Sequence, residues 1–275
     1  MSVRNRLTLL FALATVTFAT GCSRDSAAPT APKLGAEASS LRSADPAFFN
    51  RARVGFSGVM FVHASPDAPA VDIKLGYLPA ARALEFGQST PYRFTLSGQR
   101  DIRVNVAGTR TTVIQASPTL SRNTFYTVFA ADRVANIGPV VLVDDLTAPA
   151  AGQAHVRFVH LSPDAPAVDV AIANRGPVLF GDQAFKSASA FAPVPAGTYN
   201  LEVRVAGTQT VALPLPGITL LPGRIYTVYA KGLLAGTGAQ ALGAGILVNA
   251  PNYGYGARSA AVAQAEADLA APSEN

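Results

Sequence analysis

The chain has 275 residues, of which 49% are hydrophobic and 14% are charged, with 22 Lys and Arg against 17 Asp and Glu. This composition excludes an intrinsically disordered chain, and the length suggests about two domains of roughly 100–150 residues each. The formal net charge of +5 is spread along the chain without a basic stripe, so we expect no nucleic-acid partner.

Residues 1–21 are typical of a signal peptide. Two arginines are followed by an apolar stretch that is too short to span a bilayer comfortably, and small residues then lead to Cys22, the one cysteine of the chain. This arrangement resembles the lipobox of bacterial lipoproteins, which implies cleavage before Cys22 and lipid attachment to its sulfur. The alternatives are an ordinary secretory signal with a chance cysteine, or an uncleaved anchor. A single cysteine also excludes an intramolecular disulfide and thiolate metal cages.

Residues 22–50 are rich in Ala, Ser and Pro and have no sustained period, which predicts a flexible tether. The lipoprotein resemblance also bears on location, because Asp after the cysteine commonly retains such proteins at the inner membrane of Gram-negative bacteria, and here Ser23 stands there. We therefore expect an exported protein that contacts the membrane through its lipid and is anchored in the cell envelope at the outer membrane.

An internal repeat organises the remaining chain. Residues 61–72 read FVHASPDAPAVD and residues 158–169 read FVHLSPDAPAVD, so only one position differs. The spacing of 97 residues grows to 100 at a later Tyr-Thr-Val match, which begins at Tyr126 and Tyr226, as expected if loops changed length while strands did not. We predict two tandem domains and an Ala-rich tail that is a short helix or disordered. Their predicted bounds are residues 51–148, 153–250 and 251–275.

The period within each copy is two. Residues 199–205 alternate between apolar and polar side chains, with Arg204 on the predicted solvent face, and residues 101–106 alternate in the same way. Such strands are typical of antiparallel sheets with one buried face. Other runs lack the alternation and predict more fully buried strands: residues 125–130, 140–143, 225–230 and 246–248. The sequence predicts an all-β fold of two tandem Ig-like or fibronectin-like antiparallel β-sandwich domains.

Two tyrosines add a specific expectation. Tyr226 follows a Pro-Gly turn at the start of a predicted strand, and this stretch resembles the tyrosine corner of fibronectin-type sandwiches, in which the Tyr hydroxyl bonds backbone just upstream. Tyr126 is its expected counterpart. The chain lacks tryptophan and a core disulfide, so a true immunoglobulin domain is excluded.

The signature H-x-S-P-D-A-P-A-V-D resembles the one that marks the bacterial domain of unknown function DUF4397, and the resemblance covers both copies over residues 55–250. It implies secreted or surface-attached β-sandwich proteins without an established activity.

The signature has two interpretations. As a strand-turn-strand connection, Pro66 presets the turn, Asp67 bonds amides just ahead of it, and Asp72 points away from the core. As a site, the His and Asp residues would form a metal site or an acid–base pair. The candidate residues are His63, Asp67, Asp72, His160, Asp164 and Asp169. We favour the structural interpretation and expect neither a cofactor nor a metal. His155, which has no counterpart in the first copy, is expected to be exposed.

These observations favour a non-catalytic envelope protein that presents its sandwiches to a polysaccharide or protein partner. One alternative is a metal-assisted hydrolase that uses the His/Asp signature of each copy. Another is a purely structural spacer.

Overall fold

The alternating sequence pattern builds the strands, because a strand that packs one face on a core needs an apolar side chain at every second position. The structure, a computed structural model, describes residues 55–249. The predicted signal peptide, Cys22, the tether and the predicted tail all lie outside the described residues. No helix among residues 55–249 is long and apolar enough to cross a membrane.

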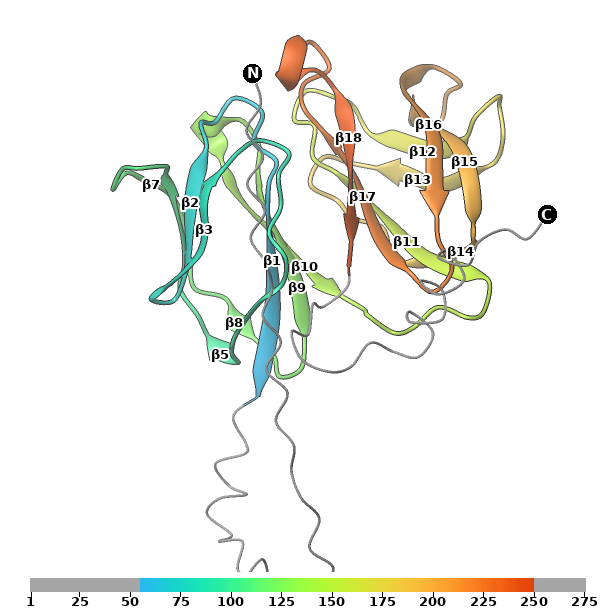
Figure 1. The fold of residues 1–275 in the computed structure, drawn as a ribbon. Helices are drawn as coiled ribbons and strands as arrows, with labels where there is room; N and C mark the ends of the chain where they lie inside the picture. Colours follow the sequence, from blue (N-terminus) through green and yellow to red (C-terminus); the bar gives the residue numbers. More distant parts are fainter. Residues whose placement is uncertain (1–54, 250–275) are drawn as a thin grey trace, which may run out of the picture. The chain divides into compact units, whose positions relative to one another are not determined.

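The first half of the described chain forms two four-stranded sheets, which we call the first sandwich (Figure 1). One sheet has the order β10-β9-β1-β4, the other has the order β3-β2-β6-β7, and β5 pairs with β8. Its elements are β1 (Phe56–His63), β2 (Val71–Leu75), β3 (Leu78–Leu84), β4 (Arg93–Leu96), β5 (Gly98–Gln99), β6 (Ile102–Val106), β7 (Thr112–Ala116), β8 (Thr119–Leu120), β9 (Phe125–Ala131), the 3-10 helix η2 (Val134–Asn136) and β10 (Gly138–Asp144).

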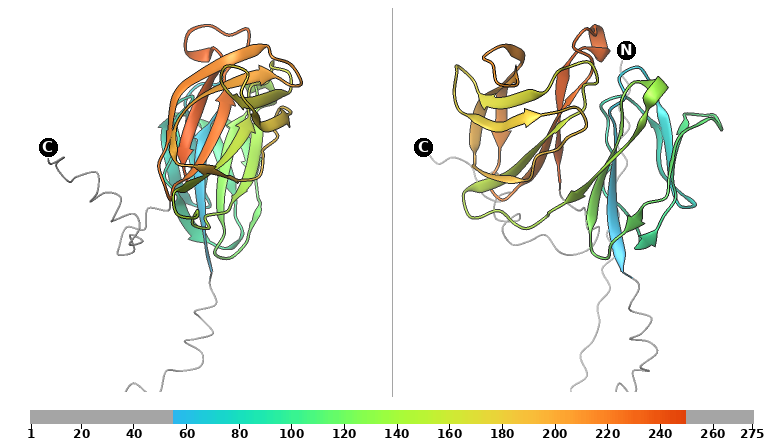
Figure 2. Two further views of the ribbon diagram at one scale, coloured as in Figure 1. Left: turned by 90° about the vertical axis from the view of Figure 1, so that its right-hand side faces the viewer. Right: turned by 180° about the vertical axis from the view of Figure 1, so that it is seen from behind.

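The second half, which we call the second sandwich, has the corresponding arrangement (Figure 2). Its sheets have the orders β14-β11-β17-β18 and β13-β12-β15-β16. Its elements are β11 (Gln153–His160), β12 (Val168–Ile172), β13 (Val178–Gln183), β14 (Ala192–Pro195), β15 (Gly197–Val205), β16 (Val211–Leu220), β17 (Ile225–Lys231), the 3-10 helix η3 (Gly238–Gln240) and β18 (Gly243–Val248).

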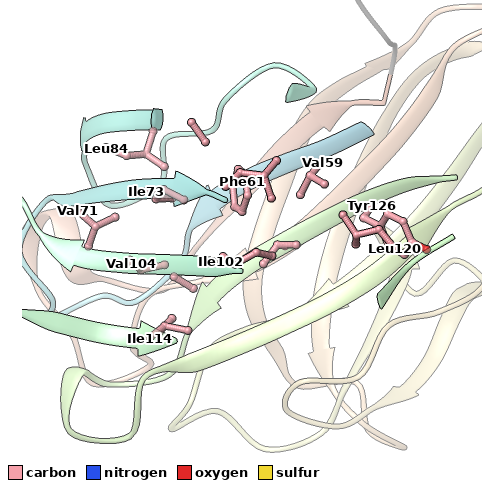
Figure 3. Packing of buried hydrophobic residues seen from close by; sticks show 14 residues of the cluster. Val59, Phe61, Val71, Ile73, Leu84, Ile102, Val104, Ile114, Leu120 and Tyr126 are labelled. Atoms are coloured by element: carbon pink, nitrogen blue, oxygen red, sulfur yellow. The ribbon is translucent and has the colours of Figure 1, made fainter. Parts of the chain in front are cut away.

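Each sandwich encloses its own apolar core. In the first, Phe61 of β1, Ile73 of β2 and Val104 of β6 belong to a cluster of buried side chains contributed by both sheets (Figure 3). A second cluster contains Phe158 and Val203 of the second sandwich. Fully burying one such side chain stabilises a fold by about 1.5–3 kcal/mol, so these clusters hold the paired sheets together. The predicted all-β sandwich fold is confirmed for residues 55–249.

Two strand pairs are parallel, which differs from the purely antiparallel sheets predicted. β1 pairs in parallel with β9, and β11 pairs in parallel with β17. Parallel neighbours require a long crossover between them. Here the strands β2 to β8 separate β1 from β9 along the chain, and this intervening chain builds the whole opposite sheet.

Arg204 corrects the predicted solvent face of residues 199–205. Its side chain is only 1% exposed, although it lies on the outer side of β15. The guanidinium donates hydrogen bonds to the carbonyls of Ile172 and Gly176 at 3.0 and 3.3 Å, and it also bonds Glu202. The prediction of a solvated arginine is wrong because these partners replace water around the charge.

The prediction that residues 140–143 and 246–248 form more fully buried strands is also wrong. Val141 and Val143 of β10 and Ile246 and Val248 of β18 are all exposed. β10 and β18 are edge strands, each with a strand neighbour on one side only, so alternate side chains remain open to solvent. The central strands β9 and β17 are buried nearly throughout, as predicted.

One face of β9 and one face of β17 pack into the core of their own sandwich. The other face of each strand packs into a third apolar cluster, which combines side chains of both sandwiches. The rings of Phe129 and Tyr229 lie 5.5 Å apart between centroids, and the Tyr229 hydroxyl donates to the Gly87 carbonyl at 3.3 Å. All described residues belong to one compact unit. The cluster includes Met60, Val62 and Phe129 of the first sandwich and Val159, Leu161 and Tyr229 of the second.

Candidate functional site

The repeated signature forms the connection between the two sheets of each sandwich. We call residues 63–72 and 160–169 the first and second SPDAP segments. The first runs from the end of β1 to the start of β2, and the second runs from β11 to β12. Because β1 and β2 belong to different sheets, as do β11 and β12, each segment links the two layers of its sandwich.

The fully buried side chain of His63 bonds two points of the first SPDAP segment. Its Nε2 lies 3.0 Å from the carbonyl oxygen of Pro69, and its Nδ1 accepts the backbone N–H of Ser65 at 3.3 Å. A carbonyl can only accept and an amide can only donate, so these partners require the neutral tautomer with the proton on Nε2. Burial lowers the pKa of His63, and the bond to Pro69 offsets part of this shift. The lowered pKa favours the same neutral form.

His160 has the same role in the second SPDAP segment. Its Nε2 lies 2.9 Å from the Pro166 carbonyl, and its Nδ1 accepts the Ser162 N–H at 3.3 Å. Burial again lowers its pKa. Both nitrogens of each imidazole are therefore engaged with backbone, and neither ring presents a free lone pair to a metal ion or to a proton in transfer.

Asp67 and Asp164 accept hydrogen bonds from a loop far along the chain. The prediction that Asp67 bonds the amides just ahead of it is therefore wrong. Asp67 Oδ1 accepts the N–H of Val134 at 2.7 Å, and Asp164 Oδ1 accepts the N–H of Leu234 at the same distance. Burial would raise the pKa of Asp164, but its amide bonds, led by that of Leu234, outweigh burial and hold the pKa below its usual value. These carboxylates tie each SPDAP segment to the loop after β9 or β17.

Asp72 and Asp169 each accept one amide from a flanking strand, β3 or β13, and one from the turn that follows the other flanking strand, β6 or β15. Asp72 Oδ1 accepts the N–H of Ala83 at 2.8 Å, and its Oδ2 accepts the N–H of Gly108 at 3.0 Å. The Ala83 bond, followed by the Gly108 bond, lowers the pKa of Asp72. Asp169 makes the matching bonds. Asp72 thus ties β2 to β3 and to the turn after β6, and Asp169 ties β12 to β13 and to the turn after β15.

The serines of the SPDAP segments and the third histidine show no arrangement of a catalytic or metal site among the described residues. Ser65 is buried, and its Oγ has no hydrogen-bond partner within residues 55–249, whereas Ser162 Oγ lies 3.4 Å from Asp164 Oδ1. His155 is partly exposed on β11, apart from both segments. Among the described residues, no three His, Cys, Asp or Glu side chains come together as a metal-binding group.

The tyrosine corners are confirmed in both sandwiches. The Tyr226 hydroxyl accepts the N–H of Leu221 at 3.1 Å, and the Tyr126 hydroxyl accepts the N–H of Ser121 at 2.8 Å. Each bond closes the turn before the central strand that follows it, as in other sandwiches of this type.

A buried polar network at the junction of the two sandwiches is absent from the sequence-based predictions. Arg157 Nη2 lies 2.5 Å from Asp144 Oδ1, and its Nε donates to Thr227 Oγ1 at 2.9 Å. The other carboxylate oxygen accepts the hydroxyls of Tyr92 and Thr127 at 2.6 and 2.7 Å. Burial raises the pKa of Tyr92 far above its usual value, and the Asp144 charge adds to the shift.

Asn249 belongs to the same polar network, which we call the junction network. Its members are Tyr92, Thr127, Asp144, Arg157, Thr227 and Asn249. The Asn249 amide donates to the Tyr92 hydroxyl at 3.0 Å, and its carbonyl oxygen accepts the Thr227 hydroxyl at 2.7 Å. The Arg157 guanidinium also lies 4.6 Å from the centroid of the Phe191 ring. One sequence signal could have indicated this network: Arg157 interrupts an apolar strand at the position that Met60 occupies in the first copy.

Comparison with known proteins gives limited matches. Among curated proteins, no match was found. Among solved structures, the chain is similar to a putative cell adhesion protein from Parabacteroides distasonis ATCC 8503, with 8% identity, coverage of 72% of this chain and 100% of that chain, and a TM-score of 0.19. At this TM-score, the likeness supports no argument about fold or function.

A family model described as Domain of unknown function (DUF4397) matches residues 57–171. The matched region spans the first sandwich from β1 onward and continues through β11 and the second SPDAP segment into β12. Both SPDAP segments, whose His and Asp side chains hold the turns described above, therefore lie within it. The chain thus carries a DUF4397 domain at residues 57–171.

Proposed function

We propose that this protein is a non-catalytic lipoprotein of the bacterial cell envelope, anchored through Cys22, and that it presents two tandem copies of a DUF4397-type sandwich for binding. The observation that carries the non-catalytic part is the engagement of every His and Asp of the SPDAP segments with backbone groups. A catalytic acid or base needs its proton or lone pair available to a substrate. Both nitrogens of each SPDAP histidine are bonded to backbone instead, as is at least one oxygen of each SPDAP aspartate.

The proposed anchor rests on the sequence before the folded part. The single cysteine stands directly after the small residues that end the apolar stretch, as lipid attachment requires. Several acyl chains bury many methylenes at about 0.8 kcal/mol each, so they would hold the chain firmly on a membrane. Residues 22–50 would then separate the sandwiches from the membrane surface.

Metabolic labelling tests the anchor. The full chain, produced in a Gram-negative host fed with radioactive palmitate, should carry label and fractionate with the outer membrane, and Cys22→Ala should lose both properties. Label that persists in Cys22→Ala, or a wild-type chain that stays soluble and unlabelled, would refute the anchor.

Metal analysis tests the non-catalytic part against the metal-assisted hydrolase. We expect the purified chain to hold no stoichiometric metal and to keep its melting temperature in chelator, because both nitrogens of His63 and of His160 are bonded to backbone. About one bound zinc per SPDAP segment, together with a large loss of stability in chelator, would favour the hydrolase instead.

A further inference from the structure

We propose that an open groove on the first sandwich binds an acidic polysaccharide; this rests on the proposed envelope-binding function and specifies the class of its partner. The groove has a volume of about 910 Å³. The β2–β3 hairpin, the end of β4, Phe56, residues 99–101 and Arg103 line it. Three cationic side chains and one carboxylate belong to its lining, which gives it a net positive charge.

Two of the cations, Lys74 and Arg103, face each other across neighbouring strands. They are directly paired in the antiparallel ladder of β2 and β6, and both are exposed. Like charges at such positions destabilise a sheet. No ion pair of residues 55–249 includes either side chain. Natural proteins tolerate such locally unfavourable pairs mainly at functional sites. An anionic ligand bound between Lys74 and Arg103 would relieve their repulsion.

The third cation, Arg100, is fixed in place without a counter-ion. Its guanidinium donates to the carbonyls of Leu96, Ser97 and Gln99 at 2.7, 3.1 and 3.0 Å. These carbonyls orient the group and leave its full charge uncompensated. The one carboxylate of the groove, Asp101, accepts the Ser117 hydroxyl at 2.7 Å, and no ion pair of residues 55–249 joins it to Arg100.

Exposed apolar side chains stand beside these charges. Tyr77 is fully exposed at the tip of the β2–β3 hairpin, where the positive φ of Gly76, 61°, permits a two-residue turn. Phe56 and Leu96 are cross-strand partners and are also exposed. A flat aromatic surface next to cations suits a sugar ring that carries carboxylates, because the apolar face of the ring can stack while its charges pair.

The second sandwich does not repeat this chemistry. Ala171 and Glu202 occupy the ladder pair that corresponds to Lys74 and Arg103, and Gln153 and Pro195 occupy the pair that corresponds to Phe56 and Leu96. The two sandwiches share corresponding strand orders, so the paired cations and the paired apolar side chains are particular to the first sandwich. Binding should therefore belong to the first sandwich alone.

Titration with polygalacturonate tests the proposal on the chain from residue 22 onward, with Cys22→Ser to prevent lipid attachment. We expect the double variant Lys74→Gln/Arg103→Gln to weaken binding roughly tenfold or more. Tyr77→Ala should also weaken it, while neutral dextran should not bind. The matched control Arg110→Gln/Arg175→Gln removes the same charge from exposed positions outside the groove and should leave the affinity unchanged.

Three results would overturn the proposal. The first is the absence of binding to polygalacturonate, and the second is an equal loss of affinity in the matched control. The third is equally tight binding of polyglutamate that Tyr77→Ala does not affect, since simple charge attraction would then explain the data. Palmitate labelling of Cys22 and the metal content do not depend on this groove, so they separate its failure from failure of the proposed function.

Discussion

Arg157 of the second sandwich and Asp144 of the first form an ion pair that solvent does not reach. The joined atoms are 2.5 Å apart, and the two side chains are 3% and 0% exposed. The corresponding partners in the repeat are Met60 for Arg157 and Asn249 for Asp144, since Thr127 bonds Asp144 as Thr227 bonds Asn249. The two sandwiches therefore meet through complementary, non-identical surfaces, which favours their pairing with each other over pairing of two like copies.

Removal of the arginine should destabilise the chain strongly. Arg157→Met places the side chain of the equivalent Met60 at this position and leaves Asp144 buried without a cation, so we expect a loss of about 3–5 kcal/mol in the free energy of unfolding. Urea denaturation measures this change. The control Arg133→Met breaks a partly exposed pair with Asp164 at 3.5 Å and should cost about 1 kcal/mol or less.

The double variant Arg157→Met/Asp144→Asn gives a sharper test, because it removes both charges at once. It should recover a large part of the stability lost in Arg157→Met, since the penalty comes from the uncompensated carboxylate. Equal stability of Arg157→Met and Arg133→Met would contradict this account of the junction network.

The junction should also make the two sandwiches unfold together. Isolated residues 51–148 would expose Met60, Val62 and Phe129 of the third cluster and would leave Asp144 without its cation. We expect this fragment to be less stable than the full chain or to self-associate, and we expect one calorimetric transition for the full chain. Two well-separated transitions, with one reproduced by the fragment, would show that the junction contributes little.

Much of the fold follows from local patterns. The two-residue period identified the core positions of β6 and β15, and the Pro-Gly turn before Tyr226 indicated a bond that the structure contains. The parallel pairing of β1 with β9 could not be predicted, because local periodicity carries no information on which strands become neighbours.

The surroundings of polar residues were harder to predict. Arg204 has the period of a solvent-facing residue, yet the carbonyls of Ile172 at the end of β12 and of Gly176 just after it bind its guanidinium. Only the tertiary arrangement brings those carbonyls to it. For the same reason, the signature suggested that Asp67 bonds its own turn, whereas its partner Val134 lies 67 residues further along the chain. Contacts between segments far apart in sequence decided both cases.

The buried histidines should make stability depend on pH in a defined window. The pKa values of His63 and His160 are lowered in the folded state, chiefly by burial, so as the pH falls the unfolded chain takes up protons first. Stability is then fully present above about pH 7 and decreases below about pH 6.5, by up to about 1.4 kcal/mol per pH unit for each histidine. Urea denaturation between pH 8 and roughly pH 5 measures the slope.

The variant His63→Gln/His160→Gln is the control for this prediction. It should be less stable at every pH, but its stability should lose most of the dependence between those limits. Carboxylates with lowered pKa, such as Asp72 and Asp164, lose their contribution only near pH 4 and below, outside the window. An unchanged slope in the variant would exclude the histidines as its source.

The tyrosine corners should contribute separately in each sandwich. Tyr226→Phe removes the acceptor for the Leu221 amide and should cost about 1 kcal/mol, and Tyr126→Phe should cost a similar amount at Ser121. Tyr77→Phe is a suitable control because that side chain is fully exposed. Thermal unfolding of the three variants compares these effects, and a Tyr226→Phe chain as stable as Tyr77→Phe would contradict a stabilising corner.

In the structure, His63 and His160 are neutral imidazoles that bond the backbone of their own segments. Long-range proton–nitrogen NMR of the imidazoles in the full chain observes this tautomer directly. We predict that His63 and His160 both carry the proton on Nε2, because Pro69 and Pro166 accept it, and that added zinc leaves their resonances in place. Protonation on Nδ1, or nitrogen shifts that follow the zinc concentration, would contradict the structural role and point to a site.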